Sequence, residues 1–126
     1  MSLRIDGTIF AFHFETPDDL LPASYPPDLV SELRRVSAQG PVGLLATVGP
    51  QTRTVDPRVI GFWLERARDP EIRIRAIAVV TEKLAIKIAL TAFGKTCGAL
   101  GLPLQVRHTS DQASARAWLQ EALPAP

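Results

Sequence analysis

The chain has 126 residues, a formal net charge of +1 and 46% hydrophobic residues, which is typical of one globular domain. The nearly balanced charge argues against a nucleic-acid partner, and the single cysteine excludes an internal disulfide and fits a reducing compartment. No apolar run approaches the roughly 20 residues that span a bilayer, and Met1–Asp6 lacks a signal-peptide pattern, so we expect a cytoplasmic protein without membrane insertion.

The chain begins with two short predicted strands, Leu3–Ile5 and Thr8–Phe14. They are joined by Asp6 and Gly7, a pair that tolerates the positive φ angles of a tight hairpin turn. The second strand alternates, which places three aromatic residues on one face. We expect this face to be the core side: Phe10, Phe12 and Phe14.

A proline-rich segment, Glu15–Pro27, separates the hairpin from the first helix and is predicted to be a loop. The helix is expected over Asp28–Ala38, because Gly40 followed by Pro41 is a typical signal for the end of a helix. The apolar run Val42–Val48 comes next. Its lack of alternation is typical of a strand that is buried on both faces.

The polar segment Gly49–Val55 leads into a second helix. Asp56 is placed to cap this helix, and Pro57 suits its first position, where no backbone N–H is needed. Helical spacing places Phe62 on the polar side of the helix, away from the apolar residues that face the core. We therefore expect Phe62 to lie at the surface.

The next strand is expected over Ile72–Thr81. Alternation predicts that one of its faces carries Ile72, Ile74, Ala76, Ala78 and Val80, and that the other carries Arg73, Arg75, Ile77 and Val79.

The second half then continues with a long helix, Lys83–Leu100, a short strand, Leu104–His108, and a last helix, Asp111–Leu123. Pro124–Pro126 is predicted to be a frayed tail. The apolar arc of the long helix covers about 200° of its circumference, so we expect packing on a sheet and on neighbouring helices. The arc contains Ala85, Ile86, Ile88, Ala89, Leu90, Ala92, Phe93, Cys97 and Leu100.

These elements predict one α/β domain over residues 1–123: a layered, mixed sheet of about five strands with four helices, in which an opening hairpin precedes the order αβαβαβα. This order resembles the STAS fold of the bacterial anti-sigma-factor antagonists of the SpoIIAA type. The run from Arg75 to Leu123 resembles the C-terminal half of the SpoIIAA-like (STAS/Sec14-like) group, in which a buried strand, an apolar helix and a short strand precede a last helix of the ARAWL type.

The resemblance implies a non-enzymatic regulatory module that docks a partner protein, such as a regulatory kinase, through the Gly49–Asp56 loop and the following helix. In the family, a serine or threonine in an Asp-Ser-(Ser/Thr)-Gly motif at this place is phosphorylated. The motif is absent here, and Thr54 is the candidate acceptor beside the helix N-terminus. The candidate partner-binding residues on this surface are Thr52, Thr54, Asp56, Arg58 and Phe62.

A second candidate surface lies on the polar side of the long helix. It carries Lys83, Lys87, Thr91 and Lys95, and the same stripe contains Gly94 and Gly98. A glycine inside a helix costs about 1 kcal/mol relative to alanine, so two of them suggest that something packs closely there. The neighbour could be a loop of the same chain, a second copy in a homodimer, or another protein.

Two other functions stay open. A Sec14-like protein would bind a lipid or another apolar ligand beneath the Lys83–Leu100 helix, and a small enzyme would use Glu82, Lys83 or His108. We predict no metal site, because His13 and His108 lack companions at ligand spacing. No cofactor motif is present either.

Overall fold

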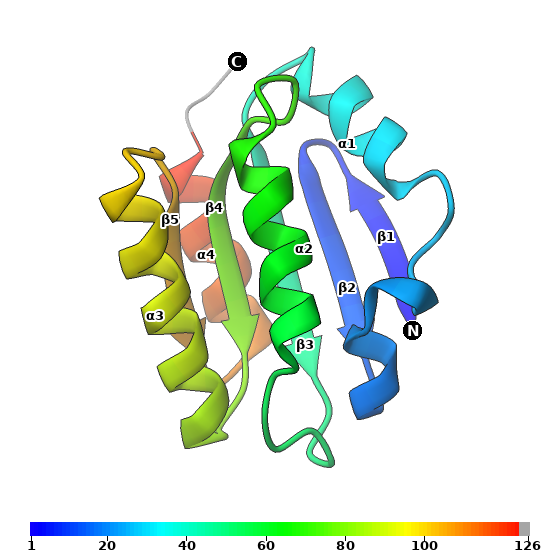
Figure 1. The fold of residues 1–126 in the computed structure, drawn as a ribbon, viewed down its shortest axis with the longest axis vertical. Coiled ribbons are helices and arrows are strands. Elements are labelled where there is room, and N and C mark those ends of the chain that lie inside the picture. The colour runs from blue at the N-terminus through cyan, green and yellow to red at the C-terminus, as the bar shows by residue number, and fades with distance from the viewer. Residues whose placement is uncertain (124–126) are drawn as a thin grey trace.

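The computed structural model describes residues 1–123, and the predicted tail, residues 124–126, lies outside this range. The described residues form an α/β domain with a five-stranded mixed sheet and four α-helices, which confirms the predicted fold class (Figure 1). The strands are β1 Ser2–Asp6, β2 Ile9–Phe14, β3 Val42–Val48, β4 Ile74–Val80 and β5 Gln105–Thr109. The helices are α1 Leu29–Ser37, α2 Pro57–Arg68, α3 Leu84–Ala99 and α4 Gln112–Ala122.

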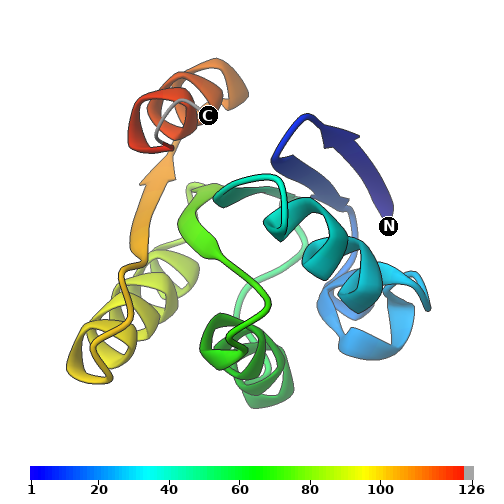
Figure 2. The same cartoon turned by 90° about the horizontal axis from the view of Figure 1, so that it is seen from above.

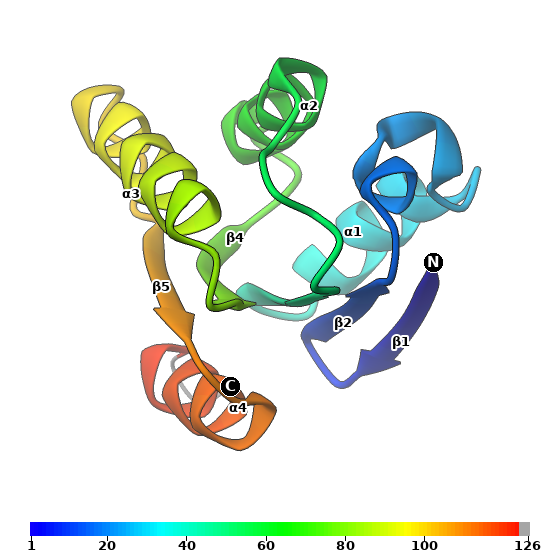
Figure 3. The same ribbon diagram turned by 90° about the horizontal axis from the view of Figure 1, so that it is seen from below.

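The sheet follows chain order, β1-β2-β3-β4-β5, and only the β1–β2 pair is antiparallel. Each of the three parallel pairs is connected by one helix, and crossovers of one handedness bring these helices to the same face. Figures 2 and 3 show α1, α2 and α3 on this face and α4 on the opposite one. The sheet is therefore the middle of three layers.

The larger core lies between the sheet and the three crossover helices. Phe10, Phe12 and Phe14 all belong to it, so the expected core side of β2 is correct. The smaller core lies under α4, where Ala115 and Leu119 pack on the other face of the sheet. The segment predicted to be a loop before α1 contains two short 3-10 helices, Pro17–Leu20 and Pro22–Ser24.

A register shift in β4 corrects the predicted faces of this strand. Val42 pairs with Ile74 and Gly43 pairs with Ala76, so Arg75 is an extra residue in β4. Such a bulge reverses the side on which the following residues point. Ile74 therefore shares the helix side with Ile77 and Val79, whereas Ala76 and Ala78 lie under α4. Strict alternation had placed Ile74 with the alanines.

Helix α3 is less buried than its wide apolar arc predicted. Ile86, Leu90, Phe93 and Cys97 are buried against the domain. Other members of the arc face solvent, since Ile88 is 60% and Leu100 is 48% exposed. The sheet and its neighbours cover only one side of this helix. Helix α3 does contact β5 and its neighbour α2, as predicted, but its apolar arc is wider than the surface that they cover.

Candidate functional site

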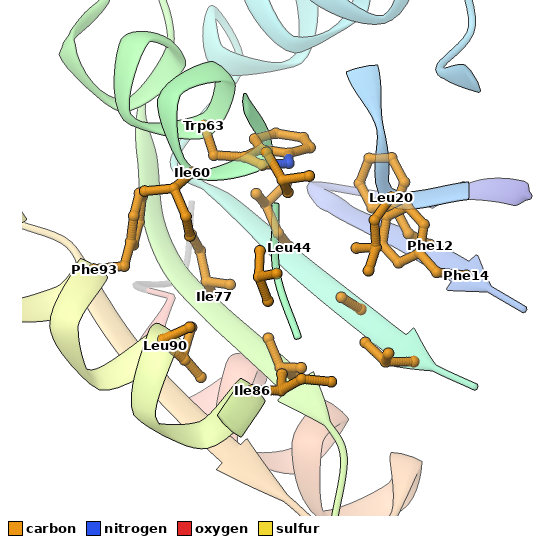
Figure 4. A pocket seen from close by; sticks show the side chains of 16 residues that line it. Phe12, Phe14, Leu20, Leu44, Ile60, Trp63, Ile77, Ile86, Leu90 and Phe93 are labelled. Carbon is orange, nitrogen blue, oxygen red and sulfur yellow. The ribbon is translucent and has the colours of Figure 1, made fainter. Parts of the chain in front are cut away.

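A cavity of about 100 Å³ lies between the helix side of the sheet and helices α2 and α3. Figure 4 shows the 16 residues that line it, with Leu90 and Phe93 directed inward from α3. All of these side chains are hydrocarbon except for the indole nitrogen of Trp63. The cavity thus offers an apolar surface rather than a set of reactive groups.

Small side chains line both the floor and the roof of the cavity. On the floor, Ala46 of β3 lies between Phe12 of β2 and Val79 of β4 in the strand register. On the roof, Ala89 of α3 lines the same space. Protein interiors are normally close-packed, so two alanines among larger residues leave a volume that no side chain fills.

One wall of the cavity is an aromatic cluster with a satisfied polar pair. Phe12 stacks on Phe14 with ring centroids 5.4 Å apart, and Trp63 meets Phe12 edge-on at 5.6 Å. The Trp63 Nε1–H donates to the Tyr25 hydroxyl at 3.1 Å, and this hydroxyl donates to the Leu20 carbonyl. Burial raises the pKa of Tyr25 to about 12. The wall is therefore uncharged, and its indole N–H is already bonded.

The cavity extends toward the carboxyl ends of the central strands, where its lining includes Val48 of β3 and Val79 of β4. Val55 of the loop before α2 and Ile86 of the first turn of α3 complete this end. In open α/β sheets, ligands bind at this edge where crossovers change sides. Here all three crossover helices share one face, so the space lies between the helices and the sheet instead.

The predicted docking loop, residues 49–56, borders this end of the cavity. Thr54 and Arg58 are exposed, as a docking surface requires. Thr52 is completely buried, and its hydroxyl has no hydrogen-bond partner among the described residues. The loop turns inward here, since the Thr52 N–H donates to the Gly49 carbonyl at 3.2 Å. The Thr52 side chain is therefore not part of the loop surface.

Asp56 has the predicted capping role. Its carboxylate accepts a hydrogen bond from the Arg58 backbone N–H at 2.8 Å and pairs with the Arg58 guanidinium at 2.9 Å. The guanidinium and backbone hydrogen bonds lower the pKa of Asp56 to about 2. The side chains of Asp56 and Arg58 thus form an ion pair at the start of α2.

Phe62 is not the exposed aromatic residue that the helical spacing predicted. Its ring contacts Tyr25 at 5.2 Å and Trp63 at 5.0 Å, and the Arg66 guanidinium covers it at 4.7 Å. This side of α2 is covered because the 3-10 segment Pro22–Ser24 packs against the helix. Phe62 is consequently half-buried and extends the aromatic wall.

Strand β5 covers one part of the candidate stripe on α3 and leaves another part open. A Cβ atom on Gly94 would lie 2.5 Å from Val106 Cγ2, so the closely packed neighbour at this glycine is the same chain. Gly98 has open space around it. Lys83 and Lys87 are half-buried and Lys95 is exposed.

The remaining candidate groups do not form a common site. Glu82 and His108 are exposed and form no side-chain hydrogen bond or ion pair within residues 1–123. No group of three potential metal ligands occurs in this range. Cys97 is buried, which raises the pKa of its thiol. None of the helices within residues 1–123 is long and apolar enough to cross a membrane.

No protein-family model, curated protein or solved structure matches this chain. The resemblance to the STAS family therefore stays a prediction.

Proposed function

We propose that the protein binds a small apolar molecule, or the hydrocarbon end of a larger one, in the cavity beneath α2 and α3. The observation that carries this proposal is the cavity of about 100 Å³ with hydrocarbon walls. An apolar cavity of about 150 Å³ in another protein stays dry and accepts benzene or xenon. The space in this chain is of the same order. This function corresponds to the predicted alternative of an apolar ligand beneath the long helix.

The chemistry of the walls defines the class of ligand. The indole N–H of Trp63 is bonded to Tyr25, so no wall group is free to pair with a polar ligand atom. Burying a hydroxyl without a partner costs roughly 1–3 kcal/mol, which lowers the affinity about five-fold to more than one hundred-fold. The bound portion should therefore be hydrocarbon, and any polar group should remain at the mouth.

A titration that uses Trp63 as the reporter tests the proposal. The chain has two tryptophans, so the Trp118→Phe variant leaves Trp63, which lines the cavity, as the only indole. We expect n-hexanol to change the Trp63 fluorescence saturably, with a Kd on the order of 1 mM or tighter. The matching diol should bind at least about five-fold more weakly, because one of its hydroxyls must enter the cavity.

A pair of alanine variants provides the control. Ala46→Leu places a larger side chain in the cavity floor and should abolish n-hexanol binding. Ala11→Leu makes the same change on the opposite face of the adjacent strand and should leave binding intact. Equal affinities for n-hexanol and the diol, or unchanged binding in Ala46→Leu, would contradict the proposal.

Docking of a partner protein through the 49–56 loop is the second proposal. It is supported by the exposure of Thr54 and Arg58, and by Val55, through which the same loop reaches the cavity. An occupied cavity could therefore alter the loop surface. Affinity purification with the Arg58→Ala variant tests this function: undiminished recovery of partners would place the interface elsewhere.

A further inference from the structure

Helix α3 presents apolar side chains to the cavity and to solvent. Ile86 and Leu90 point into the cavity (Figure 4), whereas Leu84 is 70% and Ile88 is 60% exposed. Leu84, Ile88 and Ala92 follow a four-residue spacing, so they form one continuous row along the helix. We call this row the α3 outer face. A row of exposed apolar side chains on a helix marks a candidate interaction surface.

The charged side chains of α3 and of its N-cap residue Lys83 have one sign. From residue 83 to residue 99 the charged residues are Lys83, Lys87 and Lys95, and the nearest acid in sequence is the exposed Glu82. None of these lysines forms an ion pair within residues 1–123. The surface that complements this helix is therefore apolar and negatively charged.

This charge pattern distinguishes between possible occupants. A second copy that packed α3 against α3 would bring the lysines of both copies together, and like charges repel across an interface. An anionic lipid bilayer offers negative headgroups to the lysines and an apolar layer to Leu84 and Ile88. Apolar side chains of a surface helix that lies in the membrane plane are buried at the boundary between headgroups and acyl chains.

We propose that the α3 outer face docks the protein on the surface of an anionic lipid bilayer. Docking is peripheral, with Leu84 and Ile88 at the headgroup boundary. The inference rests on the proposed function in one respect only: an apolar ligand concentrates in a bilayer, and α3 is both the docking helix and a wall of the cavity. The docked orientation would therefore bring the cavity close to the source of its ligand.

Vesicle co-sedimentation of the ligand-free protein tests the docking. We expect binding to equimolar phosphatidylcholine and phosphatidylglycerol vesicles, weakening with salt, and little binding to phosphatidylcholine alone. A lysine near an anionic surface contributes about 1 kcal/mol, so Lys87→Gln and Lys95→Gln should each weaken binding roughly five-fold. The Leu84→Glu/Ile88→Glu double variant should lose binding.

A matched double variant controls for the added charge. Ala113→Glu/Ala117→Glu introduces two acids at exposed positions on α4 and should still bind vesicles. Circular dichroism verifies that each variant folds. Docking is refuted if the wild-type protein does not bind anionic vesicles, or if the two double variants bind them with equal affinity. It is also refuted if the wild type is a dimer that Leu84→Glu/Ile88→Glu converts to monomers.

The n-hexanol titration separates this inference from the proposed function. If Leu84→Glu/Ile88→Glu loses vesicle binding and retains n-hexanol binding, the outer face docks independently of the cavity. If n-hexanol does not bind and the vesicle results hold, docking stands and the proposed function fails.

Discussion

Filling the cavity should stabilise the fold and remove its binding capacity. Ala46 lies on the cavity floor between Phe12 and Val79, so a leucine at this position extends into the space without a change of backbone. A protein that keeps such a space open gives up packing for function. Ala46→Leu should therefore change stability and affinity in opposite directions.

The size of the effect follows from the cavity volume. Unfilled volume costs about 24 cal/mol per Å³. For a cavity of about 100 Å³, this amounts to at most about 2.4 kcal/mol. The three carbons that leucine adds are worth about the same at roughly 0.8 kcal/mol each. Ordering the leucine side chain costs about 0.5–1 kcal/mol, so we expect a net gain of about 1.5 kcal/mol in the free energy of unfolding.

Urea and thermal unfolding measure this gain. For a domain of this size, about 1.5 kcal/mol corresponds to a rise in Tm of roughly 5 °C. The Ala11→Leu variant is measured in parallel, because it makes the same exchange outside the cavity. Overpacking costs about 1–3 kcal/mol, so a fall in stability for Ala46→Leu would show that no fillable space exists and would refute the reasoning.

Two further predictions concern α3 and the start of α2. Gly98→Ala should raise the free energy of unfolding by about 0.5–1 kcal/mol, because the space around Gly98 is open. Gly94→Ala should be at least about 1 kcal/mol less stable than Gly98→Ala, because its Cβ would lie 2.5 Å from Val106 Cγ2. Equal urea midpoints for the two variants would contradict the close packing of α3 on β5. Hydrogen bonds from Arg58 lower the pKa of Asp56 from 3.8 to about 2, so its charge stabilises the fold above pH 3.8 and this contribution is lost as pH falls toward 2. In the Asp56→Asn variant, the free energy of unfolding should depend less on pH across this range. Urea unfolding at a series of pH values measures this dependence, and the same dependence in variant and wild type would argue against the pairing.

The order of the elements could be predicted because local signals define them. Asp56 and Pro57 mark the start of α2, and apolar runs mark β3 and β4. The bulge at Arg75 could not be predicted, since an extra residue is defined only by the partner strand. Its effect on the pleat explains why the faces of β4 were assigned wrongly.

The site was less predictable than the fold because it depends on contacts between distant segments. The helical spacing of α2 predicts that Phe62 is exposed. Its burial depends on Tyr25, which lies much earlier in the chain. The Sec14-like resemblance and the apolar character of α3 suggested an apolar ligand beneath this helix, and this ligand stays a prediction. The volume depends on Ala46 of β3 and Ala89 of α3 lining the same space, and no local pattern contains that information.

The chain-ordered sheet has a consequence for how the protein assembles. From β2 onward, each new strand pairs with the one synthesised just before it, so a growing chain can add one strand and one helix at a time without waiting for distant segments. Each parallel pair still has to close a crossover that contains a whole helix, and this closure slows the pairing of parallel strands. The exception is α4, which follows all five strands in the chain and contacts β3 and β4. Until its 11 residues leave the ribosome, Ala76 and Ala78 have no cover, so a nascent chain that stalls before α4 should be the form most exposed to aggregation and to chaperones.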